Sequence, residues 1–181
     1  AYIHSPRNRW MQGLSILEAA QRLGRDPVKL AADLILEDDN RTTMVNFVMA
    51  EADVDFLLPK PESMIGSDGR SFSPGGPTGG GHPHPRSYGA FPRVLARYVR
   101  EKRLLTLEEA IHKMTGKPAR KLRLDRRGEL REGHFADVVV FDAARIQDRA
   151  TFEQPHQLAD GIHWVMVDGH LTLDRGRLSN D

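Results

Sequence analysis

The spacing of apolar and polar residues predicts helices in the first forty positions of the chain. Ser15 and Glu18 have the spacing of a capping box, and Gly24 is a natural end for the helix that they open. Asp26 followed by Pro27 supplies an N-cap and a proline at the first helical position. Apolar residues then recur at helical spacing, so a second, amphipathic helix is expected there.

Short apolar runs after these helices predict strands that alternate with helical segments. Residues 44–49 have the composition of a short strand, and residues 50–58 that of a helical turn that ends before Pro59. A second strand is expected over residues 63–67. It leads directly into the dipeptide Asp68-Gly69.

A glycine- and proline-rich segment, residues 70–85, interrupts this alternation and predicts a loop with no helix or strand. Loops of this length are often functional lids, although a disordered insertion explains the composition equally well. Regular structure is expected again in a helix over residues 92–103. Thr106 and Glu109 form a second capping box, which opens a helix that Gly116 closes.

Beyond Gly128 the pattern changes to that of strands. Residues 137–141 predict a buried strand. Residues 162–167 and 170–173 flank Asp168-Gly169, which predicts a hairpin with a type I′ turn.

Composition and charge exclude several classes of protein. The 181 residues are 39% hydrophobic and 28% charged, as in a globular protein, and no apolar run is long enough for a membrane span. The 26 basic residues nearly balance 25 acidic ones, so no overall field attracts nucleic acid. The local basic stretch 117–127 lacks interleaved aromatic residues and is expected to be a solvated face or a linker.

The cysteine count and the first residues bear on location and completeness. The chain has no cysteine, which excludes disulfides and thiolate metal sites within it and fits a reducing, cytoplasmic compartment. Residues 1–7 do not have the pattern of a signal peptide, and the first residue is not a methionine. We therefore expect the chain to begin inside a longer protein.

Asp68 is the first candidate for chemistry, because it follows a predicted strand and precedes a glycine. At the rim of a (β/α)8 barrel, a carboxylate in this position can take a proton from metal-polarised water. An ordinary Asp-Gly turn explains the same residues. Arg86 is a second candidate, since a loop guanidinium can bind a substrate carboxylate through two hydrogen bonds.

His82 and His84 have a spacing that would suit metal ligation on a strand. Prolines alternate with them, however, and prolines are excluded from interior strands. A surface loop, or a part in shaping the pocket, is the expected role of both. The six remaining histidines have no ligand spacing and are expected to be structural or exposed.

Several strings in this chain resemble the C-terminal portion of N-acyl-D-amino-acid deacylases, or D-aminoacylases, of the amidohydrolase superfamily. The most specific string is His-Pro-Arg-x-Tyr-Gly-x-Phe-Pro-Arg, at residues 84–93. Further matching segments are residues 64–69, 107–116, 128–142, 151–156 and 161–169. The resemblance covers most of the chain from about Gly13 onward.

The resemblance implies an α/β fold in two parts. Residues 1–127 would be the last strand-helix units of a metal-dependent (β/α)8 barrel, and residues 128–181 the C-terminal part of a small β-sandwich. Zinc would lie in the barrel mouth. Asp68 would be the general base and a metal ligand, and Arg86 and Tyr88 would bind the substrate, Arg86 through its α-carboxylate.

The same resemblance implies that the chain is incomplete as an enzyme. The histidine ligands and bridging cysteine of the family lie on earlier barrel strands, and such a barrel needs about 200 residues or more. The expected partners are therefore a small-molecule N-acyl-D-amino acid and the remaining N-terminal part of the enzyme, with neither nucleic acid nor membrane.

Other functions stay open at this point. One is another amidohydrolase, either an N-acyl-D-glutamate or N-acyl-D-aspartate deacylase or a dihydroorotase-like cyclic amidase. The other, of a different class, is a non-catalytic truncated module that needs a complementing partner.

Overall fold

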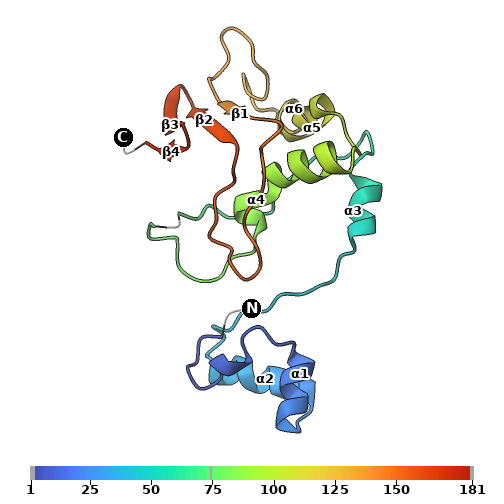
Figure 1. Ribbon diagram of the computed structural model, residues 1–181, viewed down its shortest axis with the longest axis vertical. Coiled ribbons are helices and arrows are strands. Elements are labelled where there is room, and N and C mark those ends of the chain that lie inside the picture. Colours follow the sequence, from blue (N-terminus) through green and yellow to red (C-terminus); the bar gives the residue numbers. More distant parts are fainter. Residues whose placement is uncertain (1–2, 74, 180–181) are drawn as a thin grey trace. The chain divides into compact units, whose positions relative to one another are not determined.

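The computed structural model describes residues 3–73 and 75–179. The chain divides into two compact units, residues 1–49 and 50–181, and each has a hydrophobic core of its own (Figure 1). Among the described residues, no helix combines the length and the apolar character that a membrane span requires.

The first unit contains the two predicted helices. They are α1 (Ile16–Leu23) and α2 (Pro27–Glu37), preceded by a short 3-10 helix, η1 (Arg9–Met11). Both predicted caps are present: the Glu18 amide donates to Ser15 Oγ at 3.1 Å, and the Lys29 amide donates to Asp26 Oδ1 at 2.8 Å. The helices pack through a small apolar core made of Ile3, Met11, Ala19, Ala20, Leu30 and Leu34.

The second unit begins with helices that are joined by loops. They are α3 (Glu51–Leu57), α4 (Arg86–Arg93), a π-helix η2 (Val94–Glu101), α5 (Leu107–Met114) and α6 (Gly116–Leu122). The capping box at Thr106 is confirmed, with the Glu109 amide 3.2 Å from Thr106 Oγ1. Residues 117–122 of the basic stretch are helical, because they belong to α6. This helix begins two residues after the end of α5.

The predicted start of the helix at residue 92 is wrong, because helical structure begins at Arg86. Pro85 precedes that first turn, where a fixed φ favours helix entry, and its carbonyl accepts from the Tyr88 and Gly89 amides at 3.0 Å. Pro92 lies inside the helix and has no amide hydrogen to donate. The chain continues from Val94 with the wider π winding.

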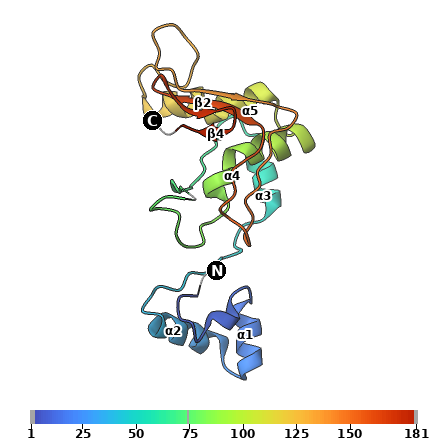
Figure 2. The ribbon, with the colours of Figure 1, turned by 60° about the vertical axis from the view of Figure 1, so that its left-hand side comes forward.

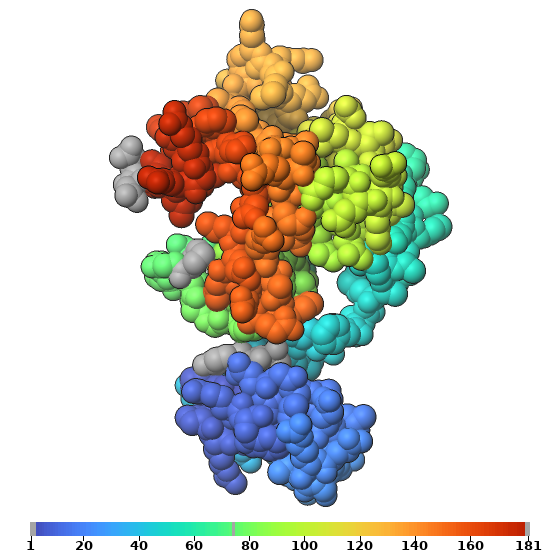
Figure 3. Space-filling model, viewed as in Figure 1, coloured from blue at the N-terminus to red at the C-terminus, as the bar shows by residue number. Residues whose placement is uncertain are grey.

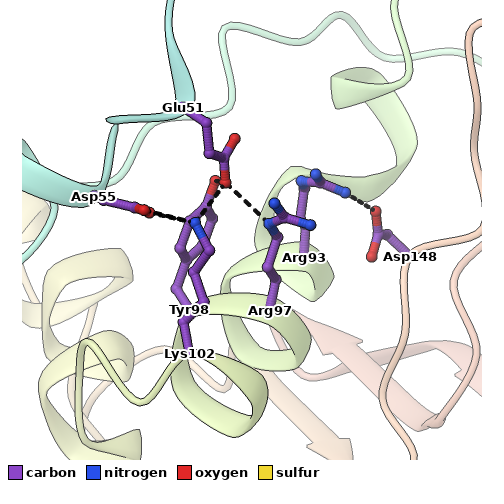
Figure 4. Close-up of polar contacts among 7 residues, drawn as sticks. All are labelled: Glu51, Asp55, Arg93, Arg97, Tyr98, Lys102 and Asp148. Atoms are coloured by element: carbon purple, nitrogen blue, oxygen red, sulfur yellow. Dashed lines mark hydrogen bonds and ion pairs between the residues drawn. The ribbon is translucent and has the colours of Figure 1, made fainter. Parts of the chain in front are cut away.

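A network of charged side chains fastens α3 to η2 (Figure 4). Glu51 accepts hydrogen bonds from Arg97 Nε at 2.9 Å, Lys102 Nζ at 3.0 Å and the Tyr98 hydroxyl at 3.1 Å. Lys102 also pairs with Asp55 at 2.6 Å. Burial raises the pKa of Glu51, but the three donors outweigh it and lower that pKa to about 2.

The strands of the second unit form one antiparallel sheet, which lies beside α5 (Figure 2). Its order is β1-β2-β3-β4, with β1 (Val138–Phe141), β2 (Ile162–Val167), β3 (His170–Asp174) and β4 (Arg177–Leu178). The predicted hairpin is confirmed: Asp168 and Gly169 have φ of 52° and 83°, as a type I′ turn requires.

The strand at β1 was predicted correctly, but its burial was not. Val139 and Val140 are 53% and 44% exposed, and because adjacent strand residues point to opposite faces, the described residues leave both faces of the sheet open at this point. At the end of β1 and the start of β2, Phe141 and Ile162 contact the core cluster that includes residues of η2 and α5. The short strand β4 was not predicted.

The strands predicted at residues 44–49 and 63–67 are absent from the structure. A strand needs a neighbouring strand to accept and donate its backbone hydrogen bonds, and no described strand lies beside either segment. In the second segment the Ile65 amide instead donates to the carbonyl of Lys113 at 3.1 Å. In the first, Phe47 is 83% exposed.

Candidate functional site

Asp68 and Arg86, which the sequence suggested separately, form a direct ion pair. Arg86 Nη2 lies 2.6 Å from Asp68 Oδ2, and Arg86 Nε donates to the backbone carbonyl of Asp68 at 2.9 Å. The Asp68 side chain is 85% exposed and that of Arg86 44% exposed. Two nitrogen atoms of the guanidinium, Nε and Nη2, contact Asp68. Its other N–H groups can still donate to a further ligand.

A close approach of two backbone segments creates this pairing. A Cβ placed on Gly69 would lie 2.9 Å from Ser87 Cα and 3.3 Å from the Arg86 carbonyl oxygen. The Arg70 amide also donates to Ser87 Oγ at 3.3 Å. Asp68 itself has a φ of 46°, a left-handed conformation that aspartate tolerates better than most residues. The two ends of the glycine-rich loop thus meet directly beside the ion pair.

A buried amine supports the segment that leads to Asp68. Lys113 is 6% exposed, and its Nζ donates to Ser63 Oγ at 2.8 Å, to the Ser63 carbonyl at 3.3 Å and to the Lys60 carbonyl. Burial lowers the pKa of Lys113, and the positive charge of Lys117 lowers it further. Lys113 thus fixes the turn from which residues 63–68 extend.

His82 and His84, which were expected to lie in a surface loop or to shape the pocket, both contact protein groups. His82 Nε2 is hydrogen-bonded to the Phe152 carbonyl, and the His84 ring meets the Phe152 ring edge-on at 5.0 Å. His84 Nδ1 accepts from the Arg86 amide at 3.0 Å. Burial lowers the pKa of His84, and the nearby Arg86 guanidinium lowers it further, which favours the neutral ring.

Tyr88, the third predicted site residue, contacts a histidine that sequence reasoning did not select. The Tyr88 hydroxyl lies 3.0 Å from His156 Nδ1, and His156 Nε2 lies 3.0 Å from the Gly81 carbonyl oxygen. Tyr88 also stacks on Phe72 at 6.3 Å between centroids, and burial raises its pKa. His156 is 68 residues away in sequence from Tyr88; it ends segment 151–156, which resembles the deacylases, but it has no spacing typical of a metal ligand or a catalytic residue.

The position of Asp68 would allow it to be one ligand of a metal ion that other residues also bind. Among the described residues, no three histidine, aspartate or glutamate side chains converge as a metal ion requires. Asp68 has an exposed carboxylate, whose Oδ2 lies 2.6 Å from Arg86 Nη2, and such a carboxylate can supply an oxygen ligand. A zinc ion at Asp68 would need its remaining ligands from residues outside the described part of the chain.

Comparison with known proteins places these residues within a family. The model of the amidohydrolase family matches residues 18–172. An N-acyl-D-aspartate deacylase of Alcaligenes xylosoxydans xylosoxydans is 44% identical over 160 residues, which are 85% of this chain and 31% of that protein. A D-aminoacylase of the same organism is 47% identical over 125 residues, 69% of this chain and 24% of that protein.

A solved structure agrees with these matches. The N-acyl-D-glutamate deacylase of Bordetella bronchiseptica, complexed with zinc and a phosphonate inhibitor that mimics the tetrahedral intermediate, aligns with a TM-score of 0.81 at 37% identity. The alignment covers 99% of this chain and 35% of that one. The chain thus spans about a third of the length of the relatives that it matches.

Proposed function

The chain belongs to the amidohydrolase family, and from this premise we propose that the protein carrying it is a zinc-dependent N-acyl-D-amino-acid deacylase. The reaction would be hydrolysis of the amide bond to a carboxylate and a free D-amino acid. The observation that carries the proposal is the ion pair of Asp68 and Arg86 at the closed base of the glycine-rich loop. It brings a general base and a carboxylate-binding cation together.

Each of the three site residues has one task in this proposal. Asp68 takes a proton from the attacking water and returns it to the nitrogen of the leaving amine when the C–N bond breaks. Arg86 binds the α-carboxylate of the substrate with the N–H groups that Asp68 leaves available. Tyr88 lines the same segment and contacts the substrate there.

Zinc is the proposed cofactor, with Asp68 as one of its ligands. When bound, zinc polarises the acyl carbonyl and activates water. The zinc-complexed relative supports this assignment. The other ligands would come from the remaining N-terminal part of the enzyme, so this chain alone would be inactive.

We propose that the fold, like the zinc site, is completed by the remaining N-terminal part of the enzyme. Residues 1–127 would contribute the last strand-helix units of a (β/α)8 barrel, and residues 128–181 would contribute strands to a small β-sandwich. Met44, Val48 and Met49 support this, because these apolar side chains are 76%, 78% and 79% exposed. Strands from the missing part would cover these side chains and pair with the backbone of residues 44–49.

An acidic D-amino acid is a second candidate for the substrate side chain. One relative is a deacylase named for N-acyl-D-aspartate, and one of the similar solved structures is a deacylase named for N-acyl-D-glutamate. Comparing hydrolysis of N-acetyl-D-glutamate, N-acetyl-D-aspartate and N-acetyl-D-methionine distinguishes an acid-specific enzyme from a broader one.

The test combines zinc content with hydrolysis of N-acetyl-D-methionine and the two acidic substrates, for this chain alone and joined to its upstream portion. The joined protein should hold zinc and turn over, and Asp68→Asn should abolish turnover. Asp39→Asn is the matched control, because Asp39 is also an exposed aspartate with a left-handed φ, of 54°, near an arginine. Full activity of Asp68→Asn, or no hydrolysis of any of the three substrates by the joined protein, would refute the proposal.

A further inference from the structure

His156 contacts the substrate-binding segment at two points that lie on either side of Arg86. Its Nε2 meets the Gly81 carbonyl before Arg86, and its Nδ1 meets the Tyr88 hydroxyl after it, both at 3.0 Å. His156 comes from the β1–β2 connection, residues 142–161. One imidazole thus closes the 81–88 segment into a loop from which Arg86 projects.

The chemistry of the two partners fixes the direction of both hydrogen bonds. A carbonyl oxygen can only accept, so His156 Nε2 must carry the hydrogen that it donates to Gly81. In the neutral ring Nδ1 is then an acceptor, and the Tyr88 hydroxyl must be the donor. The Tyr88 hydroxyl therefore donates its hydrogen to His156, and its oxygen lone pairs can accept a hydrogen bond from a bound molecule.

The rest of the β1–β2 connection follows the same segment. Phe152 contacts His82 through its carbonyl and His84 through its ring. Further along, a Cβ on Gly89 would lie 2.9 Å from Asp148 Cβ. In Figure 3 the orange residues of this connection lie next to the green residues that precede α4.

The Arg86 side chain is not held by this connection. Its guanidinium contacts Asp68, which lies at the other end of the glycine-rich loop. Its backbone amide contacts His84. The connection therefore sets where the backbone of Arg86 lies, and Asp68 sets where its side chain points. Within the connection, His156 makes polar contacts on both sides of Arg86.

We propose that His156 is a positioning residue for substrate binding, which holds Arg86 and Tyr88 in place as the Nε2–H tautomer. The proposal rests on the proposed function only for the nature of the ligand. Because Arg86 binds a carboxylate away from the bond that breaks, loss of its placement should raise KM more than it lowers kcat.

Three substitutions separate the two contacts. His156→Ala removes both, His156→Asn keeps an acceptor near the position of Nδ1, and His156→Gln keeps a donor near that of Nε2. In the joined, active protein we expect His156→Ala to raise KM about tenfold and the other two to raise it less, with kcat within about twofold. Tyr88→Phe removes the contact of Tyr88 with the substrate as well as its hydrogen bond to His156, so it should raise KM by a smaller factor in the His156→Ala background than in the unsubstituted protein. His170→Asn, in the exposed part of β3, is the control.

A readout without turnover separates this proposal from the proposed function. In the 181-residue chain labelled with ¹⁵N-histidine, two-bond ¹H–¹⁵N correlation spectra should give His156 the Nε2–H pattern, assigned by its loss in His156→Gln. Tyr88→Phe should shift the Nδ1 resonance. An Nδ1–H pattern, an Nδ1 resonance unmoved by Tyr88→Phe, or an unchanged KM in His156→Ala would overturn the positioning role, whichever substrate the enzyme takes.

Discussion

The network around Glu51 predicts how the stability of the second unit depends on pH. Glu51→Gln keeps the size of the side chain and removes the charge that Arg97, Tyr98 and Lys102 share (Figure 4). The three donors then surround a neutral amide, and α3 loses most of its electrostatic attachment to η2. The substitution should therefore destabilise the second unit at neutral pH.

The pKa of Glu51 sets the size of this effect. A fall from the ordinary 4.5 to about 2 corresponds to about 3 kcal/mol of stabilisation of the charged form. The Glu51 side chain is 43% exposed, so solvent screening reduces the expected loss to about 1 kcal/mol. Because the pKa is lowered in the folded state, this contribution is complete above pH 4.5 and is lost as the pH falls to about 2.

Urea unfolding followed by tryptophan fluorescence measures the effect. In a Trp10→Phe background, Trp164 is the remaining tryptophan and reports the second unit. Glu51→Gln should lower the free energy of unfolding by about 1 kcal/mol at pH 7 and progressively less as the pH falls below 4.5. Asp53→Asn, in the same first turn of α3, controls for the helix dipole. Equal losses in the two variants, or a Glu51→Gln loss that persists at pH 2, would refute the reasoning.

Two further substitutions test the site and the first unit. Gly69→Ala forces its backbone away from Ser87 and should reduce hydrolysis by the joined enzyme about 10- to 100-fold. Gly66→Ala, where the added methyl group meets open space, should leave the rate unchanged, and similar rates for both variants would contradict the argument. Ser15→Ala removes the N-cap of α1 and should cost about 1 kcal/mol in urea unfolding followed through Trp10 in a Trp164→Phe background. A loss below about 0.3 kcal/mol would mean that the cap does not support the first unit.

Features fixed by neighbouring residues could be predicted from the sequence. The capping boxes at Ser15 and Thr106 each depend on contacts between residues three apart, and both are present. The hairpin at Asp168-Gly169 depends on the φ preferences of two adjacent residues. Such interactions are encoded within one turn of chain, so local pattern is sufficient to find them.

Features that depend on distant parts of the chain could not be predicted. Asp68 and Arg86 were both selected, but their pairing depends on a chain reversal over 18 residues that the glycine-rich composition does not specify. His156 reaches Tyr88 only after the β1–β2 connection folds back on α4. The segment 63–67 has the composition of a strand, but it lacks a described partner strand and bonds to Lys113 instead.

Because the two ends of the glycine-rich loop are in contact, the length of that loop can change without moving Asp68 and Arg86 relative to each other. Gly69 touches Ser87, so the residues between them form a loop whose ends are held together whatever its size. The entropy of closing such a loop grows only logarithmically, by about 0.6 kcal/mol for each doubling of its length. We therefore expect that a peptide tag or a small domain can be inserted within residues 75–80 while Asp68 and Arg86 remain paired.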